Sequence, residues 1–478
     1  MTTPDQVTAR LTGSGQPFEI HSEEVLGHRL DVFAHRQRSL VELLEESIVH
    51  QDTDYLVTRE SRLTFAEHHG VVSALATALQ QEHGIGKGDR VALCGANSAE
   101  WVIAFWATVS LGAIAVGMNS MWAAPELRHG LALTEPSVIF TDGPRRHLVE
   151  DPAVPTLSFE QDLWSLVEKH RGAPLPAVDI DEDDPAVIFF TSGTTGRAKG
   201  ATHSHRNMIA AVWFHLLNDA VATELGSPPH ERRYLLATPL FHIAGLHNLA
   251  VVRLAVGDTA VVHLGKFDID LVLRLIEDER VTNWAAVPTM VSRLVEADLS
   301  SHDLGSLRTL SVSSAPSSPA LRERLREVLP TAGRSLSTSY GLTESSTAAT
   351  VAPAMELLHD PDSVGRPSVT MEVEVRDGQG RVTPEGTEGE VFLRGAQMML
   401  GYWRNPEATA ESTSTDGWFR TGDLGWVADG RLHMTSRRSD LILRGGENVY
   451  PAEVEHQLAT HEAVDECIVR GVPDDAVG

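Results

Sequence analysis

A run of small hydroxyl residues and glycines that ends in one lysine is the strongest chemical signal in this sequence. Residues 190–200 read FTSGTTGRAKG and directly follow an expected strand. Glycine allows backbone N–H groups to approach an anion closely and tolerates positive φ. The groups available to an anion are the hydroxyls of Thr191, Ser192, Thr194 and Thr195 and the ammonium of Lys199. This set suits a polyphosphate, although such a segment alone could equally be a flexible turn.

The segment differs from the common P-loop of nucleotide-binding proteins. Gly193 and Gly196 are too close together for the G-x-x-x-x-G-K-[ST] pattern. Any phosphate site built here therefore belongs to another class.

Three later segments decide how the first is interpreted. Residues 339–344 read SYGLTE, 421–424 read TGDL, and 437–455 read RRSDLILRGGENVYPAEVE. In this order and spacing the four segments resemble the adenylate-forming (AMP-binding) superfamily, which contains acyl-CoA synthetases, carrier-protein adenylation domains and luciferases. The resemblance extends from about residue 60 to the end of the chain, and the last segment is most similar to fatty-acid- or aryl-CoA ligases.

The resemblance implies a site for ATP phosphates and Mg²⁺. The loop Thr191–Lys199 matches the family's phosphate-binding loop, with Ala198 where a proline is usual. Glu344 matches the acidic Mg²⁺ ligand, and a carboxylate oxygen is a donor that Mg²⁺ prefers. Lys199, Glu344 and His242 are thus the expected catalytic residues, with Glu344 as the metal ligand.

The rest of the nucleotide site is implied in the same way. Asp423 matches the ribose-binding aspartate, and Arg437 matches an arginine that reaches ribose or phosphate, with Ser436 replacing the usual preceding glycine. Tyr340 is expected to stack on adenine, although a core aromatic is the alternative. The other nucleotide contacts that the resemblance implies are Ala315 and Pro316 of the segment SSAP, together with Gly341 and Thr343.

The acyl end of the site is expected at residues 238–246, TPLFHIAGL. In the family, the histidine matched by His242 lies beside the substrate carboxylate and the thiol path; without that context a packed core histidine is the simpler interpretation. His247 is a weaker candidate for the pocket wall. Because the neighbouring residues are apolar and unpaired buried charges are costly, the substrate is expected to lack an α-ammonium group.

The implied reaction is ATP-dependent formation of an acyl-AMP with release of pyrophosphate, followed by transfer to CoA. ATP, Mg²⁺ and CoA are the expected cofactor and co-substrates. Transfer to the phosphopantetheine of a carrier protein is an alternative. A nucleotide-binding paralogue without turnover and a luciferase-type oxygenase are others.

The elements that must position these residues alternate between strands and helices. Expected strands at 90–95, 113–118 and 137–142 are separated by helices at about 98–111 and 125–133, which is typical of parallel α/β units. Residues 143–184 read as a connector, and a strand follows at 186–190. Further strands are expected in RYLLATP, DTAVVHL, VTNWAAVP and LRTLSVS.

The expected fold is therefore α/β. A large N-terminal AMP-binding domain, residues 1–435, contains two layered α/β subdomains and a β-rich, distorted-barrel subdomain at about 364–435. Residues 436–478 begin a small mobile α+β domain. The family's domain continues further and carries a lysine near its end, so the chain is expected to be a fragment of a longer gene product.

Composition narrows the partners and the setting. A formal net charge of −27 disfavours nucleic acid and anionic membranes. The uncharged stretch 101–118 is expected to be a buried helix, a turn at Gly112 and a buried strand, with no integral membrane segment. Two distant cysteines and the absence of a signal peptide favour the cytoplasm. A carboxylic acid, ATP and CoA are the expected partners, and a homodimer is left open.

Overall fold

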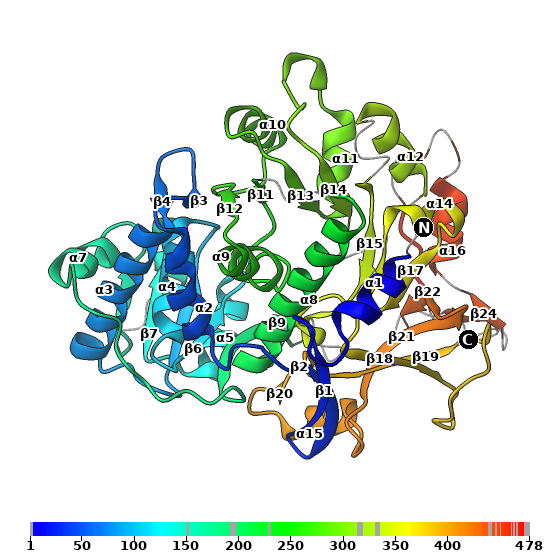
Figure 1. Ribbon diagram of the computed structural model, residues 1–478, viewed down its shortest axis with the longest axis horizontal. Coiled ribbons are helices and arrows are strands. Elements are labelled where there is room, and N and C mark those ends of the chain that lie inside the picture. Colours follow the sequence, from blue (N-terminus) through cyan, green and yellow to red (C-terminus); the bar gives the residue numbers. More distant parts are fainter. Residues whose placement is uncertain are drawn as a thin grey trace.

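Three sheets organise the protein, and each contributes to one central region (Figure 1). The computed structural model describes residues 3–149, 153–191, 197–227, 231–312, 319–329, 335–437, 442–444, 447–449, 451–459, 461, 464 and 467–472. The first sheet lies on the left of Figure 1, the second at the top, and the third on the right. The expected α/β fold with an added β-rich part is confirmed.

The first sheet has seven strands in the order β20-β10-β9-β6-β5-β7-β8. Its strands are β5 (Arg90–Cys94), β6 (Ile114–Gly117), β7 (Val138–Thr141), β8 (Thr156–Ser158), β9 (Pro185–Thr191), β10 (Lys199–Ser204) and β20 (Gly401–Tyr402). The strands from β9 to β8 are parallel, whereas β10 and β20 pair antiparallel. The central strands are almost wholly buried and apolar, as parallel strands covered on both faces require.

The stretch 101–118 is folded as the sequence predicted. Helix α4 (Ala99–Val109) is buried along its length, and strand β6 follows within a few residues. Gly112 makes the turn between them with φ of 65°, a conformation that glycine adopts without steric cost. In the described part of the chain no helix is long and apolar enough to span a bilayer.

The second sheet has six strands in the order β14-β13-β11-β12-β3-β4. They are β3 (Asp54–Val57), β4 (Arg62–Thr64), β11 (Arg233–Leu236), β12 (Thr259–Val262), β13 (Asn283–Ala286) and β14 (Thr309–Val312). All pairs are parallel except the edge pair of β3 with β4. The strands expected in the four middle segments are confirmed.

The third sheet is antiparallel, in the linear order β15-β16-β17-β22-β21-β19-β18. Its strands are β15 (Thr338–Tyr340), β16 (Thr350–Ala352), β17 (Ser363–Pro367), β18 (Met371–Arg376), β19 (Gly389–Gly395), β21 (Phe419–Ala428) and β22 (Arg431–Arg437). Two of its strands, β15 and β16, precede residue 364, where the β-rich part was expected to begin. After β22, the last strand of the sheet along the chain, come β23 (Ile442–Arg444), β24 (Glu447–Val449) and α16 (Pro451–Ala459).

Helices cover the sheets and lie between the parallel strands. They include α1 (Pro4–Leu11), α2 (Leu40–Glu46), α3 (Phe65–His83), α5 (Ala124–Thr134), α6 (Arg146–Val149), α7 (Asp162–Lys169), α8 (His205–Glu224), α9 (Val252–Val256), α10 (Ile269–Asp278), α11 (Pro288–Glu296), α12 (Pro319–Val328), α14 (Ala354–His359) and α15 (Pro406–Ser412). Helix α3 shows why the boundaries fall where they do. Thr64 and Glu67 form a capping box at its start, and Gly84 in a left-handed conformation ends it.

The expected connector at 143–184 is wrong in part. It contains β8, which extends the first sheet beside β7, and α7, which packs against α3. Leu163 and Val167, one helical turn apart, are the buried positions of α7. The proline-rich and charged residues around this short amphipathic helix hid its pattern.

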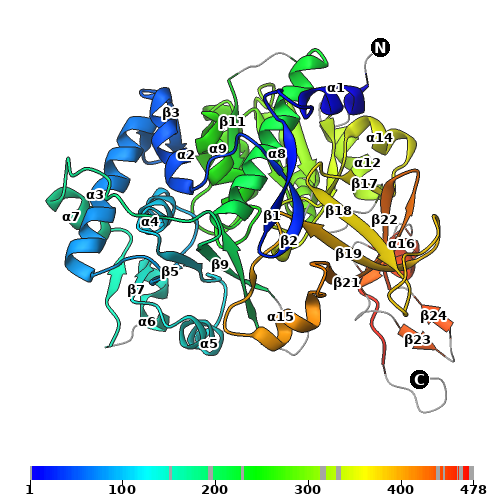
Figure 2. The same cartoon turned by 60° about the horizontal axis from the view of Figure 1, so that its bottom comes forward.

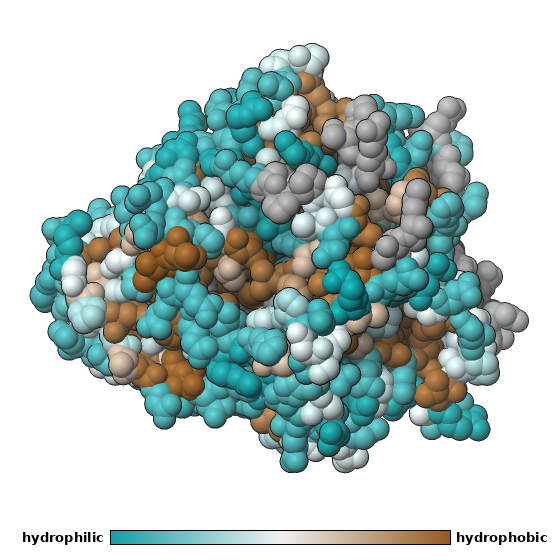
Figure 3. Space-filling model, viewed as in Figure 1, coloured by the Kyte–Doolittle hydropathy of each residue, from teal (hydrophilic) through white to brown (hydrophobic). Residues whose placement is uncertain are grey.

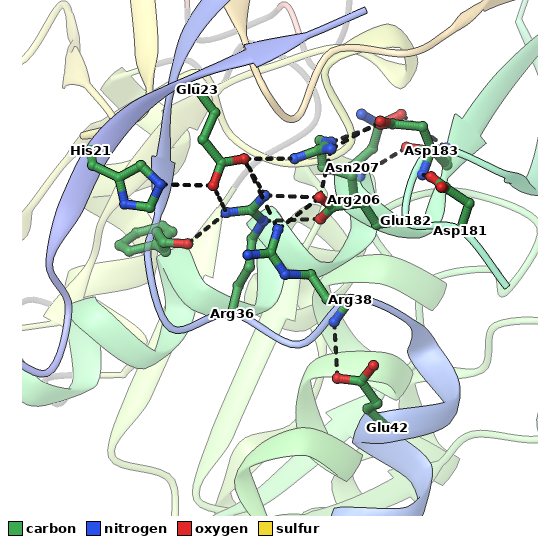
Figure 4. A network of polar contacts seen from close by, with 12 residues as sticks. His21, Glu23, Arg36, Arg38, Glu42, Asp181, Glu182, Asp183, Arg206 and Asn207 are labelled. Atoms are coloured by element: carbon green, nitrogen blue, oxygen red, sulfur yellow. Dashed lines mark hydrogen bonds and ion pairs between the residues drawn. The ribbon is translucent and has the colours of Figure 1, made fainter.

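An ion network fastens the N-terminal hairpin to the first sheet and α8 (Figure 4). The hairpin consists of β1 (Ile20–Val25) and β2 (His28–Phe33) and lies between β9 and the strands β18 and β19 in Figure 2. Arg36, with a side chain only 2% exposed, donates to Glu23 at 2.7 Å and to Glu182 at 3.0 Å. Arg206 reaches Glu182 at 2.6 Å. Glu182, in the acidic segment that precedes β9, is therefore neutralised by two buried arginines.

The surface reflects the acidic composition. Hydrophilic residues cover most of the face seen in Figure 3, with apolar areas toward its left and centre. Val49, in the 3-10 turn Ser47–His50, is among the exposed large apolar residues.

Candidate functional site

A cavity of about 1570 Å³ opens where the three sheets meet. Thr191 and Lys199 line it from the first sheet, Thr238 and Val287 from segments that follow β11 and β13 of the second, and Asp423 from β21 of the third. Ligand sites of parallel α/β sheets lie beyond the carboxyl ends of the strands, which is where Thr191, Thr238 and Val287 are. Lys199 begins the antiparallel strand β10 and lies opposite Thr191 at the same edge. The cavity thus unites residues that are more than 200 positions apart in sequence.

One side of the cavity presents a fixed carboxylate. The Tyr340 hydroxyl donates a hydrogen bond of 2.6 Å to Oδ2 of Asp423, whose residue is 6% exposed. The Asp423 N–H donates to the Thr421 hydroxyl, which donates to the Val391 carbonyl. In the register of β21 and β22, the backbone of Asp423 lies opposite that of Arg437. A carboxylate held in this way can accept hydrogen bonds from paired hydroxyls such as those of a ribose.

Two side chains of opposite charge, Lys199 and Glu344, lie on either side of Tyr402 in another part of the cavity. The Lys199 ammonium is 5.0 Å from the centre of the Tyr402 ring, and the Tyr402 hydroxyl donates to Oε1 of Glu344 at 2.7 Å. Burial and the negative charge of Glu344 raise the pKa of the Tyr402 phenol, so it remains a donor. All three side chains line the cavity, and Glu344 is 8% exposed.

The turn that carries Glu344 depends on a glycine. A Cβ on Gly341 would lie 2.8 Å from the Thr347 carbonyl oxygen, too close for any other residue. Gly341 and Thr343 both line the cavity beside Glu344. Both residues therefore lie at the same cavity wall as Glu344.

The His242 side chain lines a less polar wall. Burial lowers its pKa, and its ring lies 4.5 Å from that of Phe241. The loop is held by Asn97, whose amide donates to the Thr238 carbonyl and accepts from the Leu240 N–H, each at 2.9 Å. This wall therefore offers an uncharged imidazole among apolar neighbours.

His247 is not brought into the cavity lining. It is fully buried in the π-helical turn Leu246–Val251, with Nδ1 3.2 Å from the Ser346 carbonyl oxygen. Its ring is 5.2 Å from those of His203 and Phe189. It packs behind the pocket wall and does not form it.

Several expected site residues lie outside the described part of the structure. They are Ser192, Gly193, Thr194, Thr195, Gly196, Ala315 and Pro316, and only the backbone of Arg437 is described. One cavity brings together the other expected residues: Thr191, Lys199, His242, Gly341, Thr343, Glu344 and Asp423. Tyr340 contacts this set through its hydrogen bond to Asp423.

Sequence reasoning missed Asn97 and Tyr402. Asn97 lies in a turn after β5 and carries no motif. Tyr402 reaches the site only because β20 pairs with β10, and a two-residue strand gives no periodic signal. The glycine and two aromatic residues of the segment GYW, residues 401–403, were the only signal in the sequence that could have pointed to Tyr402.

Magnesium fits the donor chemistry of this site. The described residues contain no cluster of three or more His, Cys, Asp or Glu that could hold a metal alone. Mg²⁺ is commonly held by one or two carboxylates together with substrate phosphates. Glu344, a buried carboxylate facing the same cavity as Lys199, suits that arrangement.

Comparison with known proteins decides the family. Residues 44–403 match the family described as AMP-binding enzyme. The chain belongs to the AMP-binding enzyme family. This AMP-binding enzyme is 36% identical to the feruloyl-CoA synthase of an Amycolatopsis species over 414 residues, which cover 86% of this chain and 81% of that one. It is 32% identical to the long-chain-fatty-acid–CoA ligase FadD13 of Mycobacterium tuberculosis over 455 residues, 93% and 86% of the two chains.

Solved structures agree with the sequence relatives. The o-succinylbenzoate coenzyme A synthetase (MenE) from Bacillus subtilis, in complex with ATP and magnesium ion, matches with a TM-score of 0.80 and 30% identity. The match covers 92% of this chain and 88% of that one. This AMP-binding enzyme is an acid–thiol ligase that uses ATP to form an acyl-AMP and transfers the acyl group to CoA.

Proposed function

We propose that this enzyme activates aliphatic or aromatic carboxylic acids that lack an α-ammonium group. The observation that carries the proposal is the wall around His242. Its pKa is lowered by burial, so the ring is neutral, and Phe241, Ile243 and Ala244 beside it are apolar. An ammonium group placed against this wall would be desolvated without a partner, which is costly.

The relatives support the same substrate class. Their names refer to feruloyl, long-chain fatty acid and 2-succinylbenzoate groups. These acids are chemically diverse, but each lacks an α-amino group. They leave the choice between aliphatic and aromatic substrates to experiment.

The charged residues of the cavity support a proposal for the first half-reaction. A substrate carboxylate oxygen attacks the α-phosphorus of ATP, and the bond to pyrophosphate breaks. We assign Asp423 to the ribose hydroxyls and Lys199 to the phosphates that leave as pyrophosphate. Glu344 and the phosphates would hold Mg²⁺, which neutralises phosphate charge. The contribution of the protein is mainly positioning and electrostatic stabilisation.

His242 is assigned to the acyl group. A neutral imidazole can donate one hydrogen bond to the substrate carboxylate without adding a buried charge. In the second half-reaction the thiolate sulfur of CoA attacks the acyl carbon, and the bond from that carbon to AMP breaks. We assign Asn97, which holds the loop through Thr238 and Leu240, to keeping His242 in place.

A pyrophosphate-release assay tests the substrate class. The panel contains fatty acids of increasing length, ferulate-like aryl acids, and the amino acids that match each of them in size. We expect acyl-AMP, identified by mass spectrometry, only from acids without the α-amine. Adding CoA or a phosphopantetheinyl carrier protein separates the acceptors. Efficient activation of amino acids alone would overturn the proposal.

The cysteines support a setting for this reaction. Cys94 and Cys467 are both free thiols. We place the enzyme in the reducing cytoplasm, where unpaired thiols persist. Cell fractionation with an antibody against the protein tests this placement.

A further inference from the structure

Tyr402 joins two parts of the chain that the nucleotide site needs together. It belongs to β20, which pairs with β10 through Ala201 and Thr202. The Trp403 N–H donates to the Gly200 carbonyl at 2.7 Å, one residue after Lys199. The Tyr402 N–H donates to the Thr409 hydroxyl at 2.9 Å, which fixes its own backbone. A segment that lies between β19 and β21 of the third sheet is thus fastened to the strand that begins with Lys199.

The aromatic ring and the hydroxyl of Tyr402 each contact a charged residue. Its ring lies under the Lys199 ammonium, 5.0 Å from ring centre to Nζ. Its hydroxyl donates to Glu344 Oε1 at 2.7 Å. Lys199 comes from the first sheet and Glu344 from the turn after β15 of the third. One aromatic residue therefore contacts the proposed phosphate-binding cation and the proposed metal ligand.

We propose that Tyr402 is a positioning residue that arranges Glu344 for the metal and Lys199 for the phosphates before nucleotide binds. This inference rests on the roles proposed above for those two residues. The hydroxyl holds the Glu344 side chain in one rotamer before metal binds. Metal binding then costs less side-chain entropy than it would for a freely rotating carboxylate. The ring holds the ammonium by a cation–π contact, which is weak enough for phosphate oxygens to replace.

The two parts of the side chain can be separated by mutation. Tyr402→Phe removes the hydroxyl and keeps the ring, whereas Tyr402→Leu removes both. Titration calorimetry on the 478-residue chain measures binding of Mg·ATP, metal-free ATP in EDTA, and AMP. We expect Tyr402→Phe to weaken Mg·ATP by about tenfold, the scale of a hydrogen bond to a charged group. Metal-free ATP and AMP should change by less than about twofold.

Tyr402→Leu should show a different pattern. It weakens metal-free ATP as well, by about threefold, because the cation–π contact to Lys199 is lost. AMP, which lacks the outer phosphates, remains nearly unchanged. Mn²⁺ in place of Mg²⁺ gives a second readout, because its electron paramagnetic resonance spectrum in the ATP complex reports the ligand environment directly. The spectrum should change in Tyr402→Phe.

A matched control is available in Tyr55. Its buried hydroxyl donates to the Ala250 carbonyl at 2.8 Å, away from the cavity. Tyr55→Phe therefore removes an equivalent hydroxyl and should leave all three affinities and the Mn²⁺ spectrum unchanged. Thermal melts identify any variant that fails to fold; if the Leu variant does, the Phe variant alone decides the hydroxyl's role.

The outcomes separate this inference from the proposed function. Equal weakening of all three ligands in Tyr402→Phe, or no change in any, overturns the positioning role. Glu344→Gln and Lys199→Ala test the underlying assignments. If they alter metal and phosphate dependence while Tyr402→Phe does not, only the inference about Tyr402 fails. If they also have no effect, the proposed roles of Glu344 and Lys199 fail.

Discussion

The Tyr340 hydroxyl and the Asp423 carboxylate are 83 residues apart in sequence and 2.6 Å apart in the structure. The bond links β15 at one edge of the third sheet to β21 in its interior. Because Asp423 is nearly buried, its charge interacts strongly with any donor that enters the cavity. The pair therefore presents an acceptor that is oriented before nucleotide arrives.

Replacement of Asp423 by alanine should weaken ATP and AMP equally. A lost hydrogen bond to a charged group costs about 1.5–3 kcal/mol. Calorimetry of both nucleotides measures the loss, and Tyr340→Phe should produce a smaller one. If the unmutated protein binds ATP and 2′-deoxy-ATP with the same affinity, the ribose assignment has no basis.

Lys199→Ala should separate ATP from AMP. We expect pyrophosphate release to slow by roughly 100-fold, because an electrostatic contact to the phosphates that leave as pyrophosphate is lost. AMP affinity should be retained, since AMP lacks those phosphates. Lys169→Ala, which alters an exposed lysine on α7 paired with Glu82, is the control. Unchanged turnover of the Lys199 variant would count against the loop assignment.

Arg36→Met should destabilise the fold. The variant removes the buried arginine that Glu23 and Glu182 share and leaves them only Arg206 as a buried partner. Breaking a buried pair costs up to about 3–5 kcal/mol. Urea unfolding measures the loss. The control Arg171→Met breaks an exposed pair with Glu168 and should cost less than about 1 kcal/mol. Similar midpoints for the two variants would contradict the role of the network.

The same network predicts that the stability of the fold decreases in acid. The Arg36 hydrogen bond lowers the pKa of Glu23 to about 2 from an ordinary value of 4.5. Its stabilising contribution is complete above pH 4.5 and disappears as the pH falls toward 2. The midpoint difference between the unmutated protein and Arg36→Met should narrow over that range.

His68 makes the fold sensitive to milder acid. Burial lowers its pKa to about 3 from 6.5, and both ring nitrogens lack hydrogen-bond partners among the described residues. Between pH 6.5 and pH 3, His68 is protonated in the unfolded chain but not in the folded one. The free energy of unfolding therefore decreases as the pH falls through this range. His68→Phe should reduce this slope by up to about 1.4 kcal/mol per pH unit.

Urea unfolding at pH 7.5, 6.5 and 5.5 measures the slope. The exposed His147 provides the comparison, because His147→Gln should leave the slope unchanged. Other buried histidines, among them His203 and His205, retain part of the dependence in the His68 variant. An unaltered slope in His68→Phe would show that His68 does not contribute.

Prediction from sequence succeeded where one pattern determined one element. The run from β5 to β7 alternates buried strands and helices, and its boundaries were predicted to within a few residues. Helix α7 was missed because only Leu163 and Val167 carry its pattern. Composition alone says nothing about such a short amphipathic segment among prolines.

The candidate site divides in a similar way. Lys199, Glu344 and Asp423 could be predicted because each stands in a recognisable local motif, and all three line one cavity. Tyr402 was missed because its contact with Glu344 spans 58 positions and depends on strand pairing. Long-range register of this kind is set by packing, which a local sequence window does not contain.

The pairing of β20 with β10 also bears on how copies of the protein behave toward each other. An uncovered outer strand offers its peptide groups to any neighbouring chain, which is a common start of aggregation. Here the Leu400 and Trp403 N–H groups donate to the Thr202 and Gly200 carbonyls and cover that side of β10. The segment thus acts as a cover for the sheet margin. Trp403→Pro would remove one of these donors and should promote self-association, measurable by light scattering, before it affects secondary structure.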